Sequence, residues 1–200
     1  VEARALQAAL AAAADETFNC ITVDGDTSTS DAVLLLANGA SGVALDGTSR
    51  PAFTEALRVV CQELSQAIVR DGEGATKLVE IRIEGARTSE DARRAARTIA
   101  ESLLTKTAMF GGDPNWGRIL AALGRSGAEV DPNRVVLDLG GLVLFRNGAA
   151  ESYDLKSAER AVAGPEVAVH LDLGLGAGRA TMWTCDLSYD YVRINAEYHT

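Results

Sequence analysis

The chain has 200 residues, of which 47% are hydrophobic, and 28 acidic side chains against 19 basic ones give it a net charge of −9. This length and composition predict a folded protein with one domain or two small subdomains, and they exclude a disordered tail. The chain has no basic run interleaved with aromatic residues, no apolar stretch of about 20 residues and no signal-peptide pattern, so we expect a cytoplasmic protein with neither nucleic acid nor a membrane as partner.

The first 50 residues predict a helix, a polar loop and two short apolar elements. An Ala-rich stretch predicts the helix over residues 3–16. The loop Asp24–Asp31 consists of carboxylate and hydroxyl side chains apart from one glycine. The apolar runs on either side of it, Ile21–Val23 and Ala32–Ala37, are expected to be core elements that place the loop at one end of a packed layer.

This polar loop allows two interpretations. Asp24, Asp26 and Asp31 offer the oxygen ligands that Mg²⁺ or Ca²⁺ prefers. The EF-hand pattern fails, however, because its twelfth position holds Leu35 instead of a bidentate glutamate. We therefore favour a hydrogen-bonded turn that borders a site, since Asp, Ser and Thr side chains readily pair with loop backbone groups.

A second helix is predicted to start at Pro51, because apolar residues then recur at helical spacing. We interpret these residues as the core face of the helix: Phe53, Ala56, Leu57, Val60, Leu64 and Ile68.

A strand and a third helix follow. Apolar and charged residues alternate over residues 79–84, which is typical of a half-buried strand. Thr88 to Asp91 reads as a capping box that opens the helix. The expected inner face of this helix is Ala92, Ala95, Ile99 and Leu103.

The second half of the chain mixes strands and helices. Strands are expected over residues 135–139, 142–145, 166–173 and 179–186, with short helices through 119–123 and 154–160. Gly140-Gly141 indicates a turn between the first two strands. The glycines of Gly174–Gly178 precede a strand and not a helix, so a hairpin connection is favoured over a phosphate-binding loop.

These elements predict an α+β fold, a layered sandwich of helices and antiparallel or mixed sheets, over a doubly wound parallel sheet. We expect an N-terminal part over 1–110, which holds the polar loop and Glu73, and a C-terminal α+β subdomain over 111–200 that includes the C-terminal tail.

The inventory of reactive side chains is small. Cys20, Cys61 and Cys185 are odd in number and far apart, and we interpret them as buried reduced thiols. Two histidines cannot build a multi-histidine metal centre, and no Gly-x-Ser-x-Gly elbow is present. We expect no metal, no cofactor and no catalytic nucleophile within this chain.

Two features suggest a ligand site. Glu73 lies between two glycines, which allow close approach of a ligand, although a solvated loop acid has the same pattern. The last sixteen residues, 185–200, carry tyrosines and hydrogen-bonding groups that suggest a docked C-terminus.

Six separated blocks together resemble the ornithine acetyltransferase family of arginine biosynthesis, and the likeness runs from about residue 16 to Thr200. They are Phe18-Asn19, Val23–Asp31, Leu36–Ala40, Asp71–Lys77, Gly112–Ile119 and Cys185–Val192.

The resemblance implies a precursor that cuts itself before a threonine into α and β chains, which stay together as an α2β2 heterotetramer. The present sequence resembles the β chain, with a DmpA/ornithine-acetyltransferase-like fold. The nucleophilic threonine is expected about ten residues upstream of Val1.

The resemblance also implies a function and site residues. The family transfers acetyl from N-acetylornithine to glutamate by a ping-pong acetyl-threonine mechanism, and some members also accept acetyl-CoA. By position, Glu73, Asn195 and Thr200 match substrate-binding residues, while the oxyanion donors come from the α chain.

Two alternatives stay open. The chain could be a non-catalytic amino-acid-binding or regulatory module related to the family. A metal-dependent phosphotransfer protein built on the Asp24–Asp31 cluster is the other hypothesis, and a chelator would test it.

Overall fold

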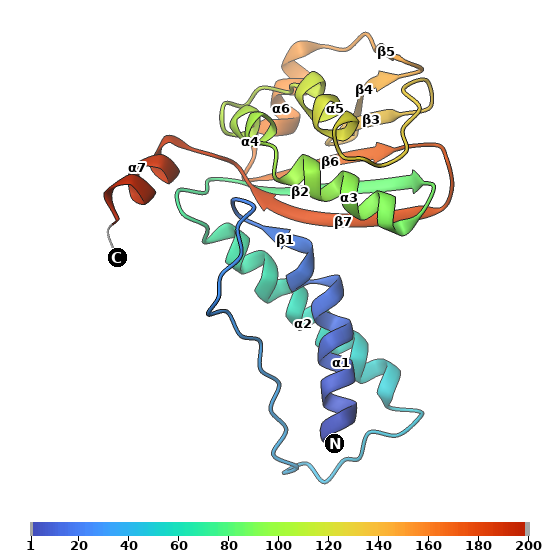
Figure 1. Cartoon of the computed structure of the whole chain (residues 1–200), viewed down its shortest axis with the longest axis vertical. Coiled ribbons are helices and arrows are strands. Elements are labelled where there is room, and N and C mark those ends of the chain that lie inside the picture. The colour runs from blue at the N-terminus through green and yellow to red at the C-terminus, as the bar shows by residue number, and fades with distance from the viewer. Residues whose placement is uncertain (1, 199–200) are drawn as a thin grey trace. The chain divides into compact units, whose positions relative to one another are not determined.

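The computed structural model describes residues 2–198, which form two compact units (Figure 1). The first unit comprises the chain up to Ile21 together with Asp26–Ile68, and the second comprises Thr22–Gly25 and the chain from Val69 onward. The division that we predicted at residue 110 falls inside the second unit.

Among the described residues, the first unit holds two α-helices and a short 3-10 helix. They are α1 (Ala3–Glu16), followed by the short 3-10 helix η1 (Phe18–Cys20), and α2 (Arg50–Arg70), whose last two residues belong to the second unit. Both helices begin within a residue of their predicted positions. Glu16 on α1 raises the pKa of Arg58 on α2, although the main cause is the hydrogen bond from Arg58 to Glu55.

The core face predicted for α2 is wrong. Its buried stripe consists of Cys61, Ser65 and Val69, one position further along the helix, whereas Val60, Leu64 and Ile68 are each about half exposed. Apolar spacing defines a stripe on a helix, but only the neighbouring elements decide which side of it is covered.

The second core element predicted beside the polar loop is also wrong. Ile21–Thr22 does form a short strand, β1. Ala32–Ala37 has no regular secondary structure, and Leu34 and Leu36 are 81% and 90% exposed. A short apolar run shows β-propensity, yet it becomes a core strand only where another strand pairs with it.

Among the described residues, the strands form one mixed sheet in the order β1-β7-β2-β6-β3-β4-β5. Its further members are β2 (Leu78–Ala86), β3 (Val136–Leu139), β4 (Leu142–Arg146), β5 (Ala149–Ala150), β6 (Glu166–Asp172) and β7 (Gly178–Cys185). β2 pairs parallel with β6 and antiparallel with β7. The α+β prediction is thus confirmed.

Helices of the second unit cover one face of this sheet. They are α3 (Ser89–Ala100), α4 (Leu103–Phe110), α5 (Trp116–Gly124) and α6 (Leu155–Ala163), with α7 (Tyr189–Glu197) following β7. In β2, Val79, Ile81 and Ile83 are buried on the covered face, as predicted, while Arg82 and Glu84 point to the other face and are exposed.

The two connections predicted from glycines differ in outcome. Gly140 and Gly141, both with positive φ, form the turn that connects β3 to β4, as expected. Gly174–Gly178 is not a hairpin, because β2 lies between β6 and β7 in the sheet. The segment instead crosses the end of β2, where the backbone nitrogens of Leu175 and Gly176 donate to the Gly85 carbonyl.

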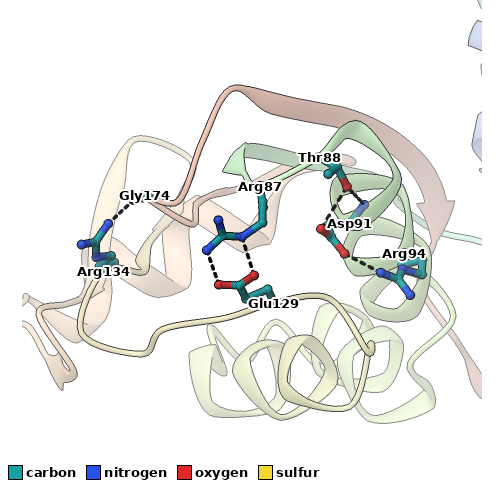
Figure 2. Close-up of polar contacts among 7 residues, drawn as sticks. All are labelled: Arg87, Thr88, Asp91, Arg94, Glu129, Arg134 and Gly174. Carbon is teal, nitrogen blue, oxygen red and sulfur yellow. Dashed lines mark hydrogen bonds and ion pairs between the residues drawn. The ribbon is translucent and has the colours of Figure 1, made fainter.

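The start of α3 confirms the predicted cap. The backbone nitrogen of Asp91 donates to Thr88 Oγ1 at 3.0 Å, and the Asp91 carboxylate accepts from Thr88 and Arg94 (Figure 2). Arg87, just before this cap, pairs with Glu129. The predicted inner face is correct for Ala92, Ala95 and Ile99 but wrong for Leu103, which is 62% exposed, because the helix ends at Ala100.

No helix of the described residues is long and apolar enough to cross a membrane.

Candidate functional site

Glu73 and Asn195, separated by 122 positions in the sequence, are in direct contact. Asn195 Nδ2 donates to Glu73 Oε2 at 2.5 Å. Glu73 lies in the loop between α2 and β2, and Asn195 lies in α7. Both residues are exposed, so a ligand can reach them.

Gly74 allows this contact because α7 approaches the loop closely. Its φ of +66° is in the left-handed region, and a Cβ atom there would lie 2.6 Å from the Tyr191 nitrogen and 2.7 Å from Ser188 Oγ. The Ser188 hydroxyl donates to the Gly74 carbonyl at 2.6 Å. Glycine is therefore required next to Glu73 for both conformation and space.

The start of α7 orients Asn195. Ser188 caps the helix by accepting from the Tyr191 nitrogen at 3.4 Å. One turn later, Asn195 Nδ2 also donates to the Tyr191 carbonyl at 3.0 Å. The amide of Asn195 is thus held by its own helix while it donates to Glu73.

Asp186 anchors the loop that carries Glu73. The residue is only 3% exposed. Its carboxylate accepts hydrogen bonds from the Thr76 backbone nitrogen at 2.8 Å, from the Thr76 hydroxyl at 2.5 Å and from the Lys77 backbone nitrogen at 2.9 Å. The Lys77 ammonium in turn donates to the carbonyls of Met109 and Val162, and its burial lowers the pKa of Lys77. These bonds join the loop to the end of β7, to α4 and to α6.

A buried lysine supports the same region. Lys106, 2% exposed, donates to Thr184 Oγ1 at 2.9 Å and to the Cys185 carbonyl, and its Nζ lies 3.5 Å from Cys185 Sγ. Burial lowers the pKa of Lys106, and the nearby thiol and the carboxylates of Asp186 and Asp24 act in the opposite direction. Burial also raises the pKa of the Cys185 thiol. Cys61 and Cys185 are buried free cysteines, as expected, whereas Cys20 is only half-buried, so the prediction of burial is wrong there.

The polar loop singled out in the sequence reaches the site through its first residue. Asp24 Oδ2 accepts from the Tyr191 hydroxyl at 3.0 Å, and the Gly25 nitrogen donates to Thr22 Oγ1. Ser30 bonds locally to Ser28, as the turn interpretation predicts. Among the described residues, no group of three or more His, Cys, Asp or Glu side chains is arranged to hold a metal ion.

Of the three predicted substrate contacts, two are thus brought together and the third, Thr200, lies outside the described residues. Sequence reasoning did not single out Tyr191, Ser188 or Lys106. Ser188 did carry a signal, as a helix-capping residue type directly before a helical stretch. A single charged residue in a helical stretch whose other members are apolar residues and two threonines was a weaker signal for Lys106.

The comparison with protein families decides the family. The model of the ArgJ family matches residues 1–200. The chain belongs to the ArgJ family. In their curated names, the relatives of this chain include the arginine biosynthesis bifunctional protein ArgJ of Symbiobacterium thermophilum, 52% identical over all of this chain, and the glutamate N-acetyltransferase of Methanocaldococcus jannaschii, 49% identical over 93% of it.

A solved ArgJ structure has the same fold. The arginine biosynthesis bifunctional protein argJ of Bacillus halodurans matches with a TM-score of 0.95 and 40% identity, over 99% of this chain and 95% of the solved chain. This ArgJ-family chain spans about half the length of the two curated relatives, 50% of one and 48% of the other. The family resemblance seen in the sequence is thereby confirmed.

Proposed function

We propose that this ArgJ-family chain is the substrate-binding β subunit of a cytoplasmic glutamate N-acetyltransferase in arginine biosynthesis. The observation that carries the proposal is the 2.5 Å contact between Glu73 and Asn195. It joins two of the residues that the family resemblance marks as substrate contacts, at an exposed position where a small molecule can bind. The names of the relatives support the reaction.

In the proposed reaction, acetyl passes from N-acetylornithine to the hydroxyl of an N-terminal threonine and then to the amine of glutamate, a ping-pong sequence. Neither a metal nor a cofactor takes part.

The role of this chain is to bind the amino acid. The Glu73 carboxylate would accept from the free ammonium group of N-acetylornithine in a charge-assisted hydrogen bond. A carboxylate has about four acceptor sites, so Asn195 can hold Oε2 and still leave room for a ligand donor. The amide thereby fixes the orientation of the carboxylate before substrate binds, which reduces the entropic cost of binding.

The test is E73Q in the complete enzyme, assayed for acetyl transfer over a range of N-acetylornithine concentrations. Hydrogen bonds to charged groups contribute about 1.5–3 kcal/mol, so KM should rise about 10- to 100-fold with a smaller change in kcat. E63Q is the matched control, because Glu63 is exposed on α2. An unchanged KM in E73Q contradicts the proposal.

The partner of this subunit is proposed to be the α chain of the same precursor, in an α2β2 heterotetramer. Sedimentation of the purified enzyme tests that stoichiometry. If the complete protein binds N-acetylornithine through Glu73 but transfers no acetyl group, the alternative of a non-catalytic binding module is correct.

A further inference from the structure

We propose that Tyr191 and Asp24 form a positioning pair that holds α7 so that Asn195 meets Glu73. The inference rests on the proposed function, in which Glu73 and Asn195 bind the amino-acid substrate. It assigns a role in that site to the first residue of the polar loop and to a tyrosine that does not itself need to touch substrate.

Tyr191 is bonded through three of its polar groups. Its hydroxyl donates to Asp24 Oδ2 at 3.0 Å, its backbone nitrogen donates to Ser188 Oγ at 3.4 Å, and its carbonyl accepts from Asn195 Nδ2 at 3.0 Å. Tyr191 therefore connects the polar loop, the helix cap and the side chain that holds Glu73. A shift of this residue moves the Asn195 amide directly.

Polar contacts are prominent among the interactions that place α7. None of the helix residues Tyr189–Glu197 is fully buried: Tyr191 and Ile194 are half-buried, and Val192 is 61% exposed. A helix without a fully buried face gains only part of the free energy that the hydrophobic effect can supply. Its hydrogen bonds to the rest of the second unit consequently have a large share in its placement.

Asp24 provides a fixed acceptor for the tyrosine. It directly follows Val23, whose carbonyl accepts from Cys185 Sγ at 3.6 Å, and precedes Gly25, whose nitrogen donates to buried Thr22. The charge of Asp24 also acts on the buried Lys106 and favours its protonated form. The acceptor thus belongs to a segment held in the second unit.

The main test is Y191F in the complete enzyme, because it removes one hydroxyl and keeps the ring. Loss of one hydrogen bond corresponds to a factor of about 3 to 10 in an equilibrium. We expect KM for N-acetylornithine to rise by that factor, with kcat and the thermal midpoint close to those of the wild type. A purely structural role would lower the midpoint and leave KM unchanged.

Tyr189 offers the matched control. Tyr189 is 85% exposed, and its ring packs edge-on against that of Phe110 with the two ring centroids 5.5 Å apart. A phenylalanine at position 189 retains this contact. Y189F should therefore keep the wild-type KM. An equal rise of KM in Y189F and Y191F would overturn the assignment, because it would show that loss of either hydroxyl has the same effect.

Two double variants test the pathway of the effect. D24A should raise KM as Y191F does, and the combination should be no worse than either change alone. In an E73Q background, Y191F should add little, because the contact that it positions has already lost its charge. Independent, multiplying effects in both combinations would overturn the inference.

The outcomes separate this inference from the proposed function. If E73Q leaves KM unchanged, the substrate contact itself is wrong. If E73Q raises KM while Y191F behaves as Y189F does, the proposed function stands and only the positioning pair fails.

Discussion

At the scale of single residues, the site depends on a few exact contacts between distant parts of the sequence. The spacing of glycines around Glu73 indicated a close approach, and the structure shows α7 as the element that approaches. The identity of that element could not be predicted from the glycine spacing, because a loop glycine permits close approach of a ligand or of another part of the chain without specifying which. The substrate contact expected of Thr200 stays a prediction.

Replacement of Gly74 by alanine tests how much the close approach matters. G74A combines the strain of a φ of +66° with a clash against the Tyr191 nitrogen, whereas G112A has the same φ of +66° and nothing within 4 Å of the new Cβ. We expect G74A to destabilise the protein by about 1–3 kcal/mol more than G112A, as overpacking does. Chemical denaturation of both variants measures the difference.

The KM for N-acetylornithine should also rise in G74A and not in G112A, since only the first substitution displaces α7. Equal effects of the two variants on stability and KM would contradict the account of Gly74.

At the scale of elements, periodicity and caps were good predictors where the local sequence decides the structure. The alternation in β2, the capping box of α3 and the Gly140-Gly141 turn are of this kind. Asn147-Gly148, with both residues at positive φ, connects β4 to β5, and this dipeptide is likewise a strong local hairpin signal. The prediction of a hairpin between β6 and β7 was wrong, because strand order depends on pairing between distant segments.

The cap of α3 predicts a pH dependence. The hydrogen bond from Arg94 to Asp91, together with that from Thr88, lowers the pKa of Asp91 below its usual value of 3.8 in the folded protein. The folded state then binds the proton more weakly than the unfolded state. The stabilisation is therefore fully present above about pH 4 and is lost as the pH falls through the lowered pKa.

D91N should accordingly be less stable than the wild type at neutral pH, and the difference in thermal midpoint should shrink below about pH 4. E90Q, which changes an exposed carboxyl group in the same helical turn, serves as the control and should follow the wild-type curve. A difference between D91N and the wild type that does not vary with pH would refute this explanation.

At the scale of the whole molecule, composition correctly indicated a folded chain, and the blocks of sequence identified the family. Burial in the first unit was less predictable. Val60, Leu64 and Ile68 on α2 and Leu34 and Leu36 after the polar loop are all apolar and all at least half exposed. The hydrophobic pattern predicts that such residues favour burial, but it does not identify the surface that would cover them.

The central claim is that Glu73 and Asn195 together bind the amino-acid substrate. A crystal structure of the complete enzyme with N-acetylornithine measures this directly, through the distance between the substrate ammonium nitrogen and the Glu73 carboxylate. The account predicts a charge-assisted hydrogen bond of about 2.7–2.9 Å, with the Asn195 amide still in contact with the same carboxylate. Substrate bound elsewhere, with its ammonium group paired to another residue, would contradict it.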